Sequence, residues 1–228
     1  MGATRKARIA GAGLACLLML GAAVGLTPAG CDRRGEPAPV TTKTERGGED
    51  KMVGKVLEGK KVLMIIAQKN FRDEELAEPR AVLEAAGAQV TVGAASLRES
   101  VGMLGAQVKP DVALSEVKAA DYDAVIFVGG GGATQYWQDP TAHRLAREAQ
   151  EAGEVLGAIC LAPGTLAGAG LLEGKKATAY ASAKDACIKG GARWTGSHVE
   201  VDGRIITADG PQSARKFGEA IRDALAGN

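Results

Sequence analysis

Short, nearly continuous apolar runs alternate along most of the chain with segments in which apolar residues recur at helical spacing. An unbroken apolar run of this kind is typical of a strand that is buried on both faces of a sheet. Four runs predict such strands: residues 61–66, 89–92, 124–128 and 155–159. The helical spacing predicts three helices between and after them: residues 76–86, 141–152 and 161–169. This alternation indicates an α/β fold with a mainly parallel sheet between two layers of helices.

Turn and helix-start residues complete the pattern. Asp202 and Gly203 separate two short apolar runs, which is the signature of a two-residue hairpin. We expect Pro79 near the start of its helix, where its missing N–H costs little. A final amphipathic helix is expected to begin at Pro211.

The first thirty residues have the pattern of an export signal. Three basic residues lie within residues 1–8, and residues 9–26 form an uncharged apolar run. The Ala-Gly pair before Cys31 resembles the end of a bacterial lipoprotein signal, although Pro28 replaces the usual Leu. The sequence therefore predicts lipidation of Cys31 and an exported, membrane-tethered protein, either periplasmic or on the cell surface. Plain secretion and an uncleaved anchor are the alternatives, because the run is near the lower length limit for a spanning helix.

The segment after this signal has no sustained apolar period. Residues 31–58 contain Pro, Gly, Thr and mixed charges, which predicts a flexible tether. We therefore expect a signal at residues 1–30, a tether at residues 31–58 and a single folded domain at residues 59–228.

Composition argues against several classes of function. Aromatic residues make up 4% of the chain, so a surface that stacks nucleic-acid bases is not expected. Loss of residues 1–30 removes three basic residues and no acidic one, which changes the net charge from +1 to −2. A nearly neutral domain offers no electrostatic basis for binding a polyanion. The chain has 2 histidines, so we expect no metal site, and no motif calls for a cofactor.

Two of the 4 cysteines, Cys160 and Cys187, lie in the predicted domain. Cys160 stands where a predicted strand runs into a helix, among small residues that permit a sharp turn like a nucleophile elbow. The positive end of a helix dipole there would favour the reactive thiolate. The alternative is a buried structural cysteine, because Cys packs like a small apolar residue, and this is what we expect for Cys187.

Chemically useful residues also follow two other predicted strands, namely Glu75 after the first and Gly129 with Gly130 after the third. In a parallel sheet the carboxyl ends of the strands meet at the crevice where ligands bind. We therefore expect one carboxyl of residues 73–75, with Glu75 as the candidate, to lie against the Cys160 sulfur. Since two anions would repel, one of the two groups should hold a proton. The glycine N–H groups could stabilise an oxyanion. The alternative for Glu75 is an exposed acid that favours a helix start. The alternative for the two glycines is a turn that needs their backbone freedom.

At these residues the sequence resembles the ThiJ/PfpI family of the class I glutamine amidotransferase-like superfamily. The matching segments are residues 61–66, 71–79, 122–130, 158–163, 171–176, 184–185, 201–203 and 205–207. The resemblance covers residues 59–228 and implies a flavodoxin-like sandwich that usually dimerises. It assigns the family's reactive cysteine to Cys160 and the family's neighbouring glutamate to Glu75.

The resemblance also implies that Gly129, Gly130 and Leu161 form the oxyanion side of the site. Two positions depart from the family pattern. Peptidase-like members have His directly after the cysteine, where this chain has Leu161, and a second position that often carries His, in the strand before residue 184, holds Tyr180 in the expected pocket. We expect His143 and His198 to be structural or exposed, so that neither replaces the missing base.

The resemblance implies three functions. The first is attack of Cys160 on a reactive carbonyl, either a small molecule such as methylglyoxal or a modified protein, as in a glyoxalase or deglycase. The second is a redox sensor or stress-protective binding protein, in which Glu75 holds oxidised Cys160. A cysteine peptidase or amidase is disfavoured without the adjacent His. The implied partners are the substrate, a second copy of the chain and a membrane reached through the N-terminus, but no nucleic acid.

Overall fold

A seven-stranded sheet forms the centre of the protein, of which the computed structural model describes residues 55–227. Its strands are β1 (Lys61–Ile65), β3 (Gln89–Ala94), β6 (Val112–Ala113), β7 (Ala124–Phe127), β8 (Val155–Ile159), β11 (Val199–Asp202) and β12 (Ile205–Ala208). Their order is β11-β12-β8-β7-β1-β3-β6. All neighbouring pairs are parallel except β11 and β12, which form the predicted antiparallel hairpin.

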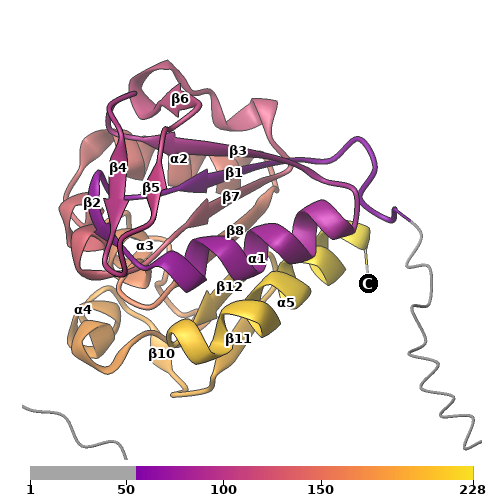
Figure 1. Ribbon diagram of the computed structural model, residues 1–228. Helices are drawn as coiled ribbons and strands as arrows, with labels where there is room; N and C mark the ends of the chain where they lie inside the picture. The colour runs from indigo at the N-terminus through magenta and orange to yellow at the C-terminus, as the bar shows by residue number, and fades with distance from the viewer. Residues whose placement is uncertain (1–54, 228) are drawn as a thin grey trace, which may run out of the picture. The chain divides into compact units, whose positions relative to one another are not determined.

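Helices cover both faces of this sheet, which makes a three-layer sandwich (Figure 1). The α-helices are α1 (Asp73–Ala85), α2 (Pro140–Glu151), α3 (Pro163–Gly168), α4 (Lys184–Lys189) and α5 (Ala214–Ala226). Figure 1 shows α1 and α5 side by side in front of the sheet, with α2 and α3 behind it. Short 3-10 turns link the elements: η1 (Leu114–Glu116), η2 (Ala119–Asp121), η3 (Gly131–Tyr136), η4 (Ala181–Ala183) and η5 (Pro211–Ser213). The predicted fold class, a mainly parallel α/β sandwich, is confirmed.

Two small sheets flank the central one. The first joins β2 (Lys69–Phe71), β4 (Ser100–Gly102) and β5 (Gln107–Val108), and the second pairs β9 (Lys176–Ala177) with β10 (Arg193–Trp194). The first sheet is built from segments that follow the carboxyl ends of β1 and β3. This sheet supplies one side of the pocket described below.

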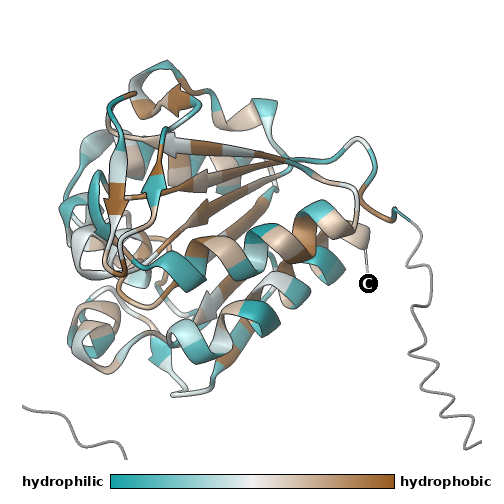
Figure 2. Ribbon diagram, viewed as in Figure 1, coloured by the Kyte–Doolittle hydropathy of each residue, from teal (hydrophilic) through white to brown (hydrophobic). Residues whose placement is uncertain are grey.

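Burial of the central strands accounts for the apolar runs. In β7 and β8 every residue is buried, and in β1 every residue after Lys61 is buried. Figure 2 shows these strands in brown, between helices whose outward faces carry teal residues. A strand covered on both faces can place apolar side chains at consecutive positions, which removes the period-two alternation of a half-exposed strand.

The expectation for Pro79 is wrong, because this residue lies inside α1 and not near its start. Its missing N–H removes one hydrogen bond from the helix interior. At this position α1 packs closely against α5. A β-carbon on Gly218 of α5 would lie 2.7 Å from Pro79 Cα, so the two helix backbones approach closely at this point.

Two boundaries also differ from expectation. The folded domain begins before residue 59, because Leu57 is fully buried and its N–H donates to the Ala86 carbonyl over 2.9 Å. The helix expected from residue 161 begins at Pro163, since the residues directly after Cys160 form a tight turn instead. Local apolar character predicted neither feature, because both depend on contacts with distant segments.

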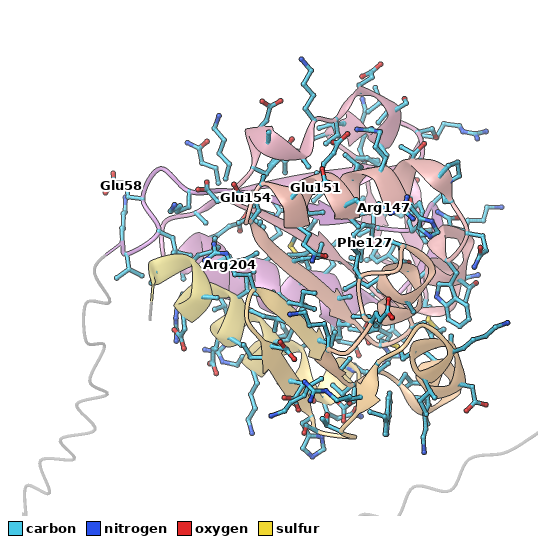
Figure 3. All side chains as sticks on the ribbon, turned by 180° about the vertical axis from the view of Figure 1, so that it is seen from behind. Glu58, Phe127, Arg147, Glu151, Glu154 and Arg204 are labelled. Carbon is cyan, nitrogen blue, oxygen red and sulfur yellow. The ribbon has the colours of Figure 1, made fainter. Side chains whose placement is uncertain are left out.

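The predicted signal, the lipidation at Cys31 and nearly all of the predicted tether lie outside the described residues. Within residues 55–227 no helix has the length and apolar character needed to cross a membrane. Figure 3 shows the sandwich from behind, with Glu154 and Arg204 near the amino ends of β8 and β12. The carboxyl ends of these strands lie at the opposite edge, where the candidate site is built.

Candidate active site

Cys160 directly follows β8 and has a φ of 63°, a left-handed backbone conformation that residues other than glycine rarely adopt. Two backbone hydrogen bonds hold it there. Its N–H donates to the Ala208 carbonyl over 2.9 Å, and its carbonyl accepts from the Tyr180 N–H over 2.9 Å. Such a conformation costs on the order of 1 kcal/mol and persists only where its surroundings enforce it. The strand-to-helix turn therefore holds Cys160 in one fixed orientation.

Glu75 lies in the first turn of α1 and is fully buried. Two anchors position this turn. The Arg72 N–H donates to the Gly129 carbonyl over 3.0 Å, and the Asp73 carboxylate accepts from the N–H groups of Leu104 and Ala106 over 2.9 and 2.8 Å. The helix start is thereby tied to the end of β7 and to the β4–β5 turn.

The three consecutive acids of α1 consequently have three different environments. Asp73 holds the β4–β5 turn, and Glu74 forms a two-pronged ion pair with Arg72 over 2.8 and 2.9 Å. Glu75 alone points inward and is fully buried. The sequence predicted an acid beside the cysteine. The directions in which successive residues point from α1 show why this acid is Glu75 and not Asp73 or Glu74.

Gly129, two residues beyond the end of β7, lies against both Glu75 and Cys160. A β-carbon on Gly129 would collide with the Glu75 carboxyl and would lie 2.5 Å from Cys160 Cβ. Glycine is therefore required here for close approach. The absence of a side chain at this position lets the carboxyl and the sulfur belong to one cluster.

Both ionisable groups of this cluster have raised pKa values. Burial raises the pKa of Glu75 to about 7, against the opposing effects of the Cys160 thiol, the Arg72 charge and the Gly129 N–H. Burial, together with the negative charge of Glu75, raises the pKa of Cys160 to about 12, while the N–H groups of Gly130 and Leu161 act to lower it. Two adjacent anions are thus disfavoured, and the pair retains at least one proton at neutral pH.

Neither carboxyl oxygen of Glu75 has a partner of ordinary hydrogen-bond geometry within residues 55–227. The Cys160 thiol is near enough to change its pKa but does not meet that geometry. A buried carboxylate without partners is costly, so the protonated form is favoured until a thiolate or a substrate accepts its proton. The carboxyl is therefore placed to donate or to receive a proton at the sulfur.

Cys160 and Glu75 line a pocket of about 380 Å³. Of the other predicted site residues, Gly130, Leu161 and Tyr180 also line it. Gly129 does not line the pocket, although its N–H approaches Glu75. Tyr180 lies just after β9 rather than within a strand, and it is half exposed. The structure thus brings together predicted residues from four segments that are far apart in the sequence.

Six lining residues were not predicted: Arg72, Met103, Gly131, Ser182, Pro211 and Gln212. A usable signal existed for Pro211 and Gln212, because they follow the carboxyl end of β12 as Cys160 follows that of β8. Arg72 precedes the predicted glutamate by three residues, in the segment that follows the first strand of the sheet. Its position relative to that strand could therefore have identified it as well. Met103 enters through the β4–β5 turn, which no sequence pattern places at the site.

The remaining histidines and the second cysteine lie elsewhere. His143 is buried in α2 with Nε2 2.9 Å from the Trp137 carbonyl, and His198 is exposed with Nδ1 2.7 Å from Asp209. Neither lines the pocket. Cys187 is fully buried in the core, and both described cysteines are free thiols. In the described part of the chain, no group of three or more His, Cys, Asp or Glu side chains could hold a metal ion.

Comparison with known proteins identifies the class of protein. A model of the DJ-1/PfpI family matches residues 60–224. The solved structure of a ThiJ/PfpI domain protein from Brachyspira murdochii superposes with a TM-score of 0.72 at 30% identity, covering 74% of this chain and 97% of that one. The chain therefore belongs to the DJ-1/PfpI family, and the resemblance found in the sequence is confirmed.

Three curated relatives give this assignment more detail. An uncharacterized protein of Methanocaldococcus jannaschii is 43% identical, over 74% of this chain and 83% of the relative. A glutathione-independent glyoxalase of Caenorhabditis elegans is 29% identical, over 74% and 90%. A deglycase of Pyrococcus horikoshii is 31% identical, over 66% and 90%. Two of these three relatives thus carry the name of an enzyme, one a glyoxalase and the other a deglycase.

Replacing Gly129 with Ala should separate the carboxyl from the sulfur. We expect Gly129→Ala to lower the free energy of unfolding by about 1–3 kcal/mol, because its methyl group has no space. Gly131→Ala is the matched control, since a β-carbon there meets nothing within 4 Å. Urea unfolding of both variants measures the difference. Equal losses of stability in the two would show that Gly129 is not confined by the pair.

Replacing Glu75 with Gln should remove a pH dependence of stability. The folded-state pKa of Glu75, about 7, is above its ordinary value of 4.5, so its contribution is fully present below pH 4.5 and is lost as pH rises through 7. Relative to Glu75→Gln, the wild type should lose about 3 kcal/mol of unfolding free energy between pH 4 and pH 8.

Chemical denaturation at several pH values measures this difference, with Glu78→Gln as the control for removing an exposed carboxylate from α1. The same Glu75→Gln variant should alkylate faster at Cys160 above pH 8, because the negative charge that raises the thiol pKa is gone. A constant stability difference across the pH range would mean that Glu75 does not titrate as described.

Proposed function

We propose that this protein acts on reactive carbonyl compounds through Cys160, as a glyoxalase-like or deglycase-like enzyme. The observation that carries the proposal is the buried Glu75 carboxyl beside the Cys160 sulfur, at the floor of an open pocket. The names of two relatives, a glyoxalase and a deglycase, support the same class of substrate. The homodimer and the export implied by the sequence stay predictions.

With methylglyoxal, the chemistry begins when the Cys160 sulfur adds to the aldehyde carbon while Glu75 gives its proton to the carbonyl oxygen. The product of this addition is a hemithioacetal. The Glu75 carboxylate then removes the proton on the former aldehyde carbon and returns it at the neighbouring ketone carbon, while the hydroxyl proton moves to the ketone oxygen. This leaves a thioester of Cys160, in which the first carbon is oxidised and the second reduced.

Water then cleaves the thioester, which releases lactate and returns a proton to the sulfur. The net reaction adds one water to methylglyoxal and needs no external oxidant or reductant. The N–H groups of Gly130 and Leu161 lower the pKa of Cys160, so they favour the thiolate that begins the reaction. In a deglycase reaction, the same sulfur would attack the carbonyl carbon of an early protein adduct.

The side chains that line the pocket include no imidazole. A Cys-His hydrolase requires such a base next to its nucleophile. Glu75 is the only carboxyl among the lining residues, and its pKa of about 7 suits proton transfer near neutral pH. The site therefore favours carbonyl chemistry driven by the carboxyl over peptide hydrolysis.

Purified protein incubated with methylglyoxal tests the proposal. We expect the wild type to form lactate and Cys160→Ala to lose at least about 100-fold in rate, because the covalent intermediate cannot form. Cys187→Ala is the matched control, since it removes a buried thiol outside the pocket. Lactate formation at the same rate by Cys160→Ala would remove this cysteine from the mechanism.

A redox role is a second candidate, favoured by the buried and unpaired Glu75 carboxyl. If peroxide oxidised Cys160 to a sulfinate, protonated Glu75 could donate a hydrogen bond to one of its oxygens. Mild peroxide followed by mass spectrometry should then show sulfinate at Cys160 and an unmodified Cys187, with less sulfinate and more sulfonate in Glu75→Ala. Oxidation confined to Cys187 would contradict this role.

A further inference from the structure

Among the side chains that line the pocket, Arg72 is the only cationic one. It immediately precedes α1 and lies three positions before Glu75. The ion pair with Glu74 fixes its guanidinium, through Nε and Nη2 over 2.8 and 2.9 Å. Glu74 itself does not line the pocket, so it contacts the guanidinium from outside. Within the described part of the chain, Nη1 makes no hydrogen bond to a side chain or backbone group.

The Arg72 charge reaches the reacting pair. The hydrogen bond to Glu74 is the main cause that raises the Arg72 pKa, and the negative charges of Glu75 and Cys160 raise it further. When Glu75 is protonated, the pocket holds one fixed positive charge and no competing carboxylate. A guanidinium held by one carboxylate still has donors for a second, because its planar fork carries five N–H groups. The chemical group that fits it best is a carboxylate on the substrate.

We propose that Arg72 is a specificity-determining residue, which binds a substrate carboxylate and selects 2-oxoaldehydes that carry one over neutral 2-oxoaldehydes. The proposal deepens the carbonyl chemistry proposed above and rests on it where turnover is concerned. A suitable substrate is 4,5-dioxopentanoate, whose aldehyde would meet Cys160 while its carboxylate meets Arg72. The same sequence of addition, proton transfer and hydrolysis consumes one water and yields 2-hydroxyglutarate.

The charge preference can be measured without any enzymatic turnover. Iodoacetate and iodoacetamide both alkylate a thiolate by forming an S–C bond and releasing iodide, but only iodoacetate carries a negative charge. The ratio of their rates at Cys160 therefore reports the local charge, and a change in thiolate population cancels from it. Each variant should also carry Cys187→Ala, so that Cys160 is the only thiol measured in the described domain.

We expect Arg72→Gln to lower the iodoacetate-to-iodoacetamide ratio on the order of five-fold, as removal of one partly screened charge predicts. Arg72→Lys should keep most of the preference, because it keeps the charge. Arg80→Gln is the matched control, since Arg80 belongs to the same helix region and also forms an ion pair, with Glu84, yet does not line the pocket. Thermal unfolding of each variant establishes that it is folded.

Turnover then separates this proposal from the proposed function. The measured quantity is the ratio of kcat/KM for 4,5-dioxopentanoate to kcat/KM for methylglyoxal. Relative to the wild type, this ratio should fall in Arg72→Gln and stay unchanged in Arg80→Gln. An alkylation ratio that is the same in Arg72→Gln and wild type would overturn the role of Arg72, whether or not the enzyme is active. A ratio that falls as expected in a protein that converts neither aldehyde would support the anion site and contradict the carbonyl activity.

Discussion

The close approach of the buried Glu75 carboxyl to Cys160 is the feature on which the candidate site, and the function proposed for it, depend. Burial disfavours charge on both groups, and each negative charge disfavours the other, so both pKa values rise. The pair can nevertheless exist only because Gly129 leaves room for it. A carboxyl whose pKa is about 7 is able to donate or accept a proton at neutral pH, which an exposed glutamate cannot do efficiently.

The rest of the structure holds this pair in place. The β8–α3 turn fixes Cys160 in a left-handed conformation, and hydrogen bonds from two other segments secure the turn on both sides. The start of α1 is tied to the end of β7 and to the β4–β5 turn, which sets the position of Glu75. The seven-stranded sheet thus acts as a rigid base, and the site is built from the segments that leave its carboxyl edge.

The start of α1 places three similar acids in three different roles. Asp73 holds a turn, Glu74 forms the ion pair with Arg72, and Glu75 is buried beside Cys160. The division follows from helix geometry, because successive residues point in directions about 100° apart. The same short segment therefore supplies both the proposed proton carrier and the proposed anion-binding residue.

The sequence by itself determined the fold class, the order of the central strands along the chain and the residues Cys160 and Glu75 as candidates. Periodicity reports burial, and the carboxyl ends of parallel strands must meet at one edge, so the fold class and the place of the site follow from local pattern. The choice of Glu75 among three consecutive acids came from the family resemblance. The tertiary structure alone decided that Arg72 and Met103 line the pocket, that Pro79 lies inside α1 against Gly218, and that Leu57 belongs to the core. Each of these depends on contacts between segments distant in sequence, and no local pattern encodes such contacts.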